Sequence, residues 1–142
     1  MASDKNIVSE LEKTLHIINI KTLTLFRENN FLISKDQWAV LNRIVAEEGS
    51  NQKDIAKDTF KDPAALTRML DLLANKGFVQ RKASKSDRRT FDIFSTVEGN
   101  RMVNRMSPIM EDFQSSIKKG LPERDQIALL QLLNKLQGKL II

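Results

Sequence analysis

The stretch NQKDIAKDTFKDPAALTRMLDLLANKGFVQRK, residues 51–82, predicts two short consecutive helices followed by a strand. Asn51 can cap the first helix, and Asp62 followed by Pro63 is a typical start for the second. Gly77 stands where a helix commonly ends in a left-handed residue. Two short helices with a tight connection are the outline of a helix-turn-helix.

The second of these helices, residues 63–76, has an apolar face and an opposite face of small and polar side chains. Small side chains let the backbone approach a surface closely. Thr67 can bond a phosphate or a base, and Arg68 can bond guanine bidentately or a phosphate. The start of the helix also favours a phosphate electrostatically. Taken alone, however, these residues also fit a plain solvent-exposed face. The residues of this small and polar face are Ala64, Thr67, Arg68, Asp71 and Asn75.

A charged hairpin is predicted next, because residues 78–82 and 90–94 can each form a strand around the tip SKSDRRT, residues 84–90. A helix pair followed by such a ribbon is the layout of a winged helix, in which the helix enters a major groove and the tip an adjacent minor groove. The negative potential of a narrow minor groove attracts arginine. We therefore expect Arg88 or Arg89 to be the inserted cation, with Lys85 on flanking phosphates.

The single acid of the tip, Asp87, would be a poor neighbour for a phosphate if it faced DNA. We expect it instead to hydrogen-bond Arg89 or the loop amides and so to fix the direction of the arginine. The net charge of the chain, +5, supports a role for this region. Residues 76–105 hold eight bases and three acids, while the remainder is nearly balanced. A local basic patch is typical of a phosphate-binding surface, although a solvated loop is the alternative for a basic run alone.

Two further helices are predicted before the helix-turn-helix, over residues 4–29 and from Ser34 to near Gly49. Ser34 and Gln37 match a capping box, and Ile33 with Trp38 matches the hydrophobic staple around it.

Two helices are predicted after the hairpin. Ser95 with Glu98 matches another capping box, opening a helix over about residues 97–118. Pro108 lies inside that helix and predicts a kink or break just before it. The last helix is predicted from Pro122 to about residue 138.

Apolar side chains cover too much of the outer helices for a monomer. A surface helix needs only one apolar stripe, but the first helix has a second apolar face, and the last is apolar over more than half of its circumference. Pairing with a symmetry mate would bury both surfaces, so the sequence predicts a homodimer. The residues in question are Ile17, Ile20 and Leu23 in the first helix, and Ile127, Leu129, Leu130, Leu132, Leu133, Leu136 and Leu140 in the last.

Composition excludes several classes of protein. The chain of 142 residues fits one domain, and 41% hydrophobic and 29% charged residues are ordinary for a globular protein. It contains no apolar run long enough for a membrane span, and its N-terminus lacks the order of a secretory signal, so we expect it to be cytoplasmic. Without cysteine, and with His16 as the single histidine, neither a thiol sensor nor a histidine-rich metal site is expected. A glycine-rich phosphate loop and a nucleophile beside a histidine are also missing, so we expect no cofactor and no enzyme activity.

Four segments, QWAVLNRI, the stretch at residues 51–82, SDRRT and STVEG, together resemble the MarR family of bacterial transcriptional regulators. The resemblance covers residues 35–100 closely and the outer helices in layout only. It implies a homodimeric winged-helix DNA binder, usually a repressor, often released by a small anionic or phenolic ligand. It also implies a recognition helix beginning at Asp62, contacts from Thr67 and Arg68, and Arg89 as the wing arginine. Ser95 departs from the family, which typically has leucine there.

We therefore predict a mainly α fold with a small β-hairpin, a winged helix-turn-helix flanked by N- and C-terminal dimerisation helices. The predicted divisions are a dimerisation helix at 1–33, a DNA-binding lobe at 34–100 with its recognition helix at about 62–76 and wing at about 78–94, and dimerisation helices at 101–142. The predicted partner is double-stranded DNA with a near-palindromic operator. A winged-helix adaptor or antirepressor that does not bind DNA is the alternative. The predicted DNA contacts are Asn51, Gln52, Ala64, Ala65, Thr67, Arg68, Lys85, Arg88 and Arg89, with Asp87 orienting the wing.

Overall fold

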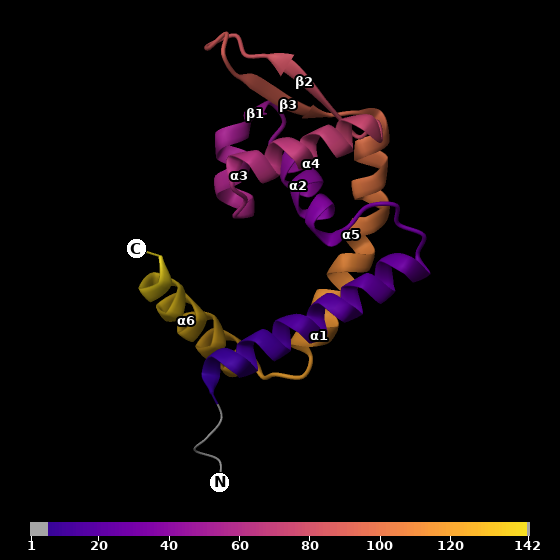
Figure 1. Cartoon of the computed structure of the whole chain (residues 1–142). Coiled ribbons are helices and arrows are strands. Elements are labelled where there is room, and N and C mark those ends of the chain that lie inside the picture. The colour runs from indigo at the N-terminus through magenta and orange to yellow at the C-terminus, as the bar shows by residue number, and fades with distance from the viewer. Residues whose placement is uncertain (1–5, 142) are drawn as a thin grey trace. The chain divides into compact units, whose positions relative to one another are not determined.

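The structure, a computed structural model, describes residues 6–141. The chain divides into two compact units, one ending at Val103 and one beginning at Asn104. Within the described residues it is mainly helical, with the six helices that were predicted and three short strands (Figure 1). None of these helices combines the length and apolarity needed to cross a bilayer.

The first two helices begin where local capping signals place them. Helix α1 spans Ile7–Glu28, so the first residues of the predicted helix lie outside the described part of the chain. Helix α2 spans Lys35–Ala46, and its capping box between Ser34 and Gln37 is confirmed in both directions. Ile33 and Trp38 around this cap are both buried, as the staple requires.

The predicted helix-turn-helix is confirmed as α3 (Gln52–Thr59) and α4 (Pro63–Asn75). The Asn51 side chain accepts a hydrogen bond from the Asp54 backbone N–H, and the Asp62 side chain accepts one from Ala65. Gly77 follows α4 with φ +81°, a left-handed conformation that favours glycine.

The sheet has one strand more than predicted. Strands β2 (Val79–Ala83) and β3 (Phe91–Ser95) form the expected hairpin, but β1 (Ser50–Asn51) pairs with the other edge of β3. The order β1-β3-β2 is antiparallel throughout, with Asn51 opposite Asp92 and Arg81 opposite Ile93. A strand of two residues is too short to show alternation in the sequence, so the hairpin prediction was incomplete.

The helix after the wing, α5, spans Val97–Lys118. The predicted capping box at its start is wrong, because Thr96 rather than Ser95 caps it by accepting a hydrogen bond of 3.0 Å from the Gly99 N–H. Ser95 ends β3 instead, where its N–H and hydroxyl both donate to the carboxylate of Glu48. The helix continues through Pro108, so the chain does not break there. A single proline removes one backbone donor, and the helical residues on each side remain.

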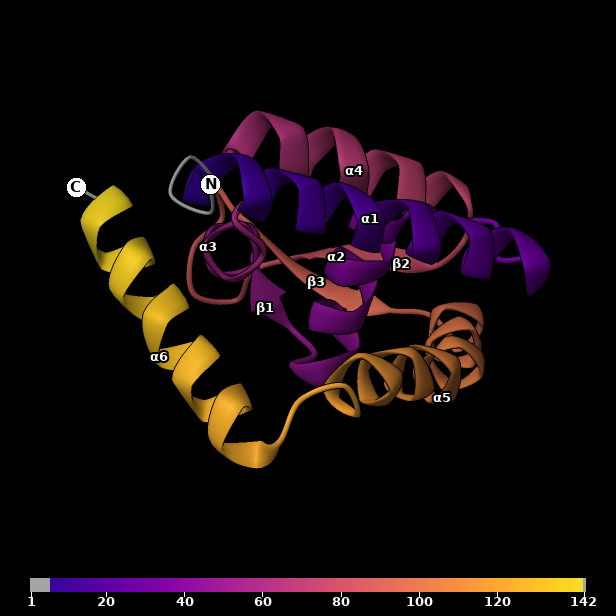
Figure 2. The ribbon, with the colours of Figure 1, turned by 90° about the horizontal axis from the view of Figure 1, so that it is seen from below.

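The core of the first unit lies where α2, α3, α4 and the sheet meet, as Figures 1 and 2 show. One face of α4 faces this core, and its opposite face is exposed. The fully buried apolar side chains of this core include Leu41, Ile44, Ile55, Leu66, Leu70, Leu73 and Ile93.

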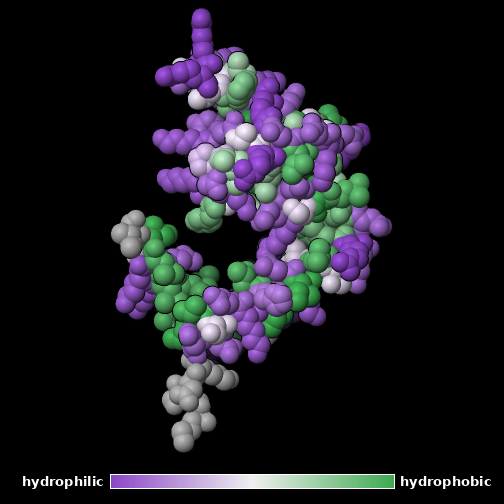
Figure 3. All heavy atoms as spheres, in the orientation of Figure 1, coloured by the Kyte–Doolittle hydropathy of each residue, from purple (hydrophilic) through white to green (hydrophobic). Residues whose placement is uncertain are grey.

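Helix α6 (Glu123–Leu140) belongs to the second unit and has no buried residue. The face of α6 seen in Figure 3 is largely hydrophobic, in contrast to the hydrophilic tip of the wing. Ile127, Leu130 and Leu132 expose half or more of their surface, 50%, 61% and 56% respectively. A monomer rarely leaves so much apolar surface in contact with water.

Candidate nucleic-acid interface

Helix α4 has one buried apolar side and one exposed side. Leu66, Leu70 and Leu73 are buried in the core, which turns Thr67 and Arg68 to the solvent. Ala64 is exposed and Ala65 half-buried at the start of the same helix. The face is therefore small near the helix start and cationic one turn further on, which suits close approach to a duplex.

Thr67 is held by its neighbours on both sides. Its hydroxyl donates to the carbonyl of Pro63 at 2.9 Å and accepts from the side chain of Gln52 at 3.4 Å. Gln52 therefore links the first helix of the pair to the second. Asn51 is also engaged in the fold, since its side chain caps α3 and its backbone pairs with Asp92 of β3.

The tip of the wing is a tight turn organised around Asp87. One of its carboxylate oxygens accepts hydrogen bonds from the backbone N–H of Arg89 at 3.0 Å and from Arg89 Nε at 3.3 Å. Its carbonyl accepts from the backbone and hydroxyl of Thr90. These bonds fix the course of the chain on both sides of Arg89.

Ser84 closes the base of this turn and was missed in the sequence. It is 8% exposed, and its hydroxyl oxygen accepts from the backbone N–H groups of Ser86 and Asp87. Its own N–H donates to the carbonyl of Thr90. Serine following a strand and preceding a charged loop is a typical signal for such a turn.

The six cations between Lys76 and Arg89 divide into two groups. Lys85, Arg88 and Arg89 are exposed at the tip, and the side chain of Arg89 is 90% exposed. The other three make contacts within the fold, which a count of charges cannot detect. Arg81 pairs with Asp71, Lys82 lies 4.7 Å from the centre of the Phe94 ring, and Lys76 donates to the Leu32 carbonyl and the Gln37 side chain.

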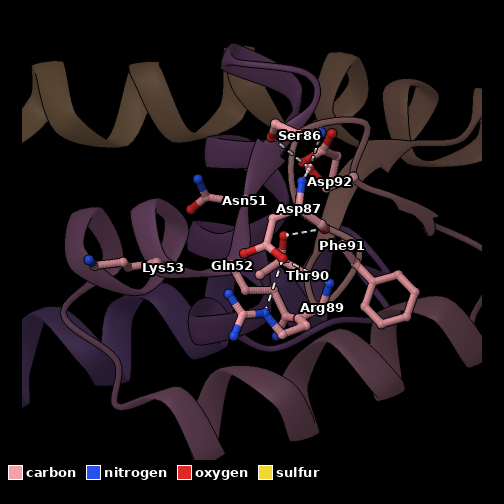
Figure 4. Close-up of a pocket in the computed structure, with 10 residues that line it drawn as sticks. Asn51, Gln52, Lys53, Ser86, Asp87, Arg89, Thr90, Phe91 and Asp92 are labelled. Carbon is pink, nitrogen blue, oxygen red and sulfur yellow. Dashed lines mark hydrogen bonds and ion pairs between the residues drawn. The ribbon is translucent and has the colours of Figure 1, made fainter.

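A polar hollow of about 440 Å³ lies between the start of α3 and the wing tip (Figure 4). In Figure 4, Asp87 and Arg89 lie side by side beneath the turn, and the ring of Phe91 projects away from them. Lys53 lines the hollow opposite the wing and was missed from the sequence, because it lies outside the basic run. Carboxylates at Asp87 and Asp92 accompany the two cations, so the hollow is mixed in charge rather than uniformly basic.

A second and more apolar hollow, of about 670 Å³, lies between α1 and the start of α2. Phe26 and Phe31 contribute aromatic rings, which meet edge to face with centroids 5.4 Å apart. Arg27 and Lys35 contribute the cations of its lining. The sequence did not identify this hollow, because its lining is assembled from two segments. No group of side chains in the described residues is arranged to hold a metal ion.

Known proteins resemble this chain in sequence and in fold. The family model described as "MarR family" matches residues 33–91. The transcriptional regulator HosA of Escherichia coli O127:H6 (strain E2348/69 / EPEC) is 26% identical over 106 residues, which are 75% of this chain and 78% of HosA.

Solved structures of similar fold include the S. aureus MepR–DNA complex, with a TM-score of 0.87 at 19% identity, covering 96% of this chain and 99% of MepR. The PcaV transcriptional regulator from Streptomyces coelicolor, in complex with its natural ligand, has a TM-score of 0.74 at 19% identity, covering 94% of this chain and 96% of PcaV.

Proposed function

We propose that the chain, whose residues 33–91 match the MarR family model, is a transcriptional regulator that acts as a homodimeric repressor released by a small ligand. Transcriptional regulators of this family are not enzymes, and the winged helix is their DNA-binding element. The repressor would occupy a promoter with two recognition helices and two wings. We expect it to act in the cytoplasm, on double-stranded DNA.

The observation that carries this proposal is the geometry of the wing. Arg89 is 90% exposed, yet its backbone and Nε are both tied to Asp87, so the cation is presented to the solvent in a fixed direction. A pre-oriented arginine suits insertion into a narrow minor groove. Helix α4 would occupy the adjacent major groove. We assign DNA contacts to Asn51, Gln52, Ala64, Ala65, Thr67, Arg68, Lys85, Arg88 and Arg89, and the orientation of the wing to Asp87.

Dimerisation is assigned to residues 1–33 and 101–142, on either side of a DNA-binding lobe at 34–100. The support is the exposed apolar surface of α6 and of α1, on which Ile17, Ile20 and Leu23 are 48%, 50% and 59% exposed. A two-fold symmetric pair buries the same patch on both copies. Two recognition helices separated by one turn of DNA, about 34 Å, would then select a near-palindromic operator.

The ligand would be a small anionic or phenolic molecule in the hollow between α1 and the start of α2. The aromatic rings of Phe26 and Phe31 suit an aromatic ring, and Arg27 and Lys35 suit a negative charge. Release from DNA requires that the ligand bind more tightly to the conformation that does not fit the operator. The similarity of the fold to PcaV, solved with its natural ligand, supports a binding role.

Selection of bound duplexes from a random pool tests the proposal. Recovery of a near-palindromic sequence, bound with an affinity that falls steeply as salt is added, is the expected result, because phosphate contacts release counterions. A protein–protein adaptor would bind no duplex even at low salt, and that outcome would refute the DNA-binding proposal. Sedimentation of the free protein tests the dimer independently, and a monomer at micromolar concentration would refute it.

A further inference from the structure

We propose that Arg81 is a positioning residue, which fixes the recognition helix α4 relative to the wing through its ion pair with Asp71. This inference rests on the proposed function, because it concerns how two DNA-binding elements are held in a single arrangement. Arg81 itself is assigned no contact with DNA.

The contact joins a helix to a strand. Arg81 lies on β2, and its Nη2 donates to Asp71 Oδ1 of α4 at 2.7 Å and to the Thr67 carbonyl at 3.4 Å. The Arg81 side chain is only 24% exposed, whereas that of Asp71 is 58% exposed. In the described part of the chain this is the only ion pair between α4 and the sheet.

Thr67 lies at the centre of this arrangement. From α3, Gln52 donates to its hydroxyl, and from β2, Arg81 donates to its carbonyl. The exposed face of α4 is thus tied on one side to the other helix of the pair and on the other side to the wing. Thr67 and Asp71 lie four residues apart on the exposed face of α4 that is proposed to meet DNA.

A directional contact adds to what the apolar packing of α4 provides. The buried face of α4, made by Leu66, Leu70 and Leu73, is held by the hydrophobic effect, which has no directional preference. A charge-assisted hydrogen bond is short and directional. The ion pair therefore adds a specific resistance to rolling of α4 about its axis and to sliding along β2.

The position of α4 matters because two elements must fit two grooves at once. Binding residues act well only when the supporting residues hold them within about 0.5 Å of the productive geometry. A small roll of α4 would move Arg68 relative to its base while Arg89 stays in the minor groove. Loss of the ion pair should therefore reduce discrimination between sequences more than it reduces general attraction to DNA.

The charge of Arg81 allows a sharp test, because the neighbouring Lys82 is a matched control. Successive side chains of a strand point to opposite faces, and Lys82 lies over the Phe94 ring rather than against α4. Arg81→Met and Lys82→Met remove the same charge from adjacent positions. The test measures the affinity of each variant for the selected operator and for a scrambled duplex over a series of salt concentrations.

For Arg81→Met we expect the ratio of operator to scrambled affinity to fall about fivefold, with the salt dependence unchanged. Asp71→Asn should lower the same ratio, and the double variant should lose no more than Arg81→Met alone, because both residues act through one contact. Lys82→Met should leave the ratio unchanged. Since Asp71 is largely exposed, Asp71→Asn keeps the test valid if Arg81→Met does not fold.

The outcomes separate the inference from the proposed function. If wild type prefers no duplex, the proposed function fails and the inference fails with it. If wild type has a preferred operator but Arg81→Met keeps the ratio, only the inference fails. A loss of affinity for both duplexes with a shallower salt dependence would instead make Arg81 a phosphate contact and would also overturn the inference. Additive losses from Arg81→Met and Asp71→Asn would also overturn the inference.

Discussion

Asp87 Oδ1 and Arg89 Nε lie 3.3 Å apart at the tip of the wing, and the same oxygen also accepts the backbone N–H of Arg89 at 3.0 Å. An acid in a surface proposed to meet DNA would ordinarily weaken binding. Here its two bonds to Arg89 limit the conformations of the arginine before DNA arrives. The ordering cost of binding is correspondingly smaller.

Replacement of Asp87 should therefore change operator affinity in the opposite direction from that expected of its charge alone. Asp87→Ala removes a negative charge but also the anchor of Arg89, and we expect operator affinity to fall about three- to tenfold. Asp92→Ala is the control, because Asp92 lines the same hollow but forms no ion pair within the described residues. Loss of the Asp92 carboxylate should leave operator affinity unchanged or raise it. If both variants bind more tightly in an equilibrium titration, the orienting role of Asp87 is wrong.

Arg89 and Arg68 should differ in what they contribute to binding. Arg89→Ala should weaken binding to all duplexes and reduce the slope of log affinity against log salt by about 0.9, as expected when one cation is lost from the interface. Arg68→Ala should cost about 1–3 kcal/mol on the operator if the arginine reads a base, and should relax the preference at one base pair. Titrations of both variants at several salt concentrations measure these effects. If both variants bind with wild-type affinity, neither residue belongs to the interface.

Gly99 is required by a close approach of two backbones. A Cβ at this position would collide with the carbonyl oxygen of Phe78, which is backbone and cannot rotate away. Gly99→Ala should lower the free energy of unfolding by about 2 kcal/mol or more. Gly138 is the control, because a Cβ there meets nothing within 4 Å, so Gly138→Ala should raise stability by about 0.5–1 kcal/mol. Urea unfolding at fixed protein concentration measures both, and equal effects would contradict the prediction.

The backbone of Phe60 is strained, although its side chain is almost fully exposed. It ends α3 with φ +55°, a left-handed conformation that disfavours a bulky side chain, and it is 89% exposed. Phe60→Asn should raise the free energy of unfolding by about 1 kcal/mol, because asparagine tolerates this conformation. Phe60→Ala keeps the backbone strain and should change stability little. A stabilisation of equal size in both variants would show that the backbone conformation is not its cause.

Local signals were sufficient to place most elements. Ser34 with Gln37, Asp62 with Pro63, and Gly77 each act within a few residues of the helix end that they define, so their effect is visible in the sequence. The start of α5 was predicted correctly, but its capping residue was misplaced by one position for a tertiary reason. Both Ser95 and Thr96 carry hydroxyls, but Glu48, far away in the sequence, binds Ser95 and keeps it in the strand.

The candidate site was predictable in its exposed parts and not in its supporting contacts. Arg89 and Asp87 are two residues apart, so their bond follows from a tight turn. The pairing of Arg81 with Asp71 joins a strand to a helix, and the sequence shows only two opposite charges ten residues apart. Lys76 was likewise counted with the basic patch, although its ammonium group bonds the segment before α2.

Asn51 has two tasks in one residue: its backbone completes the sheet against Asp92, and its side chain begins α3. The hairpin and the first helix of the pair are therefore connected directly at Asn51. A ligand or substitution that tilts β3 must also move the start of α3, so a change at the root of the wing displaces the helix beside it, whereas a change of length at the tip does not.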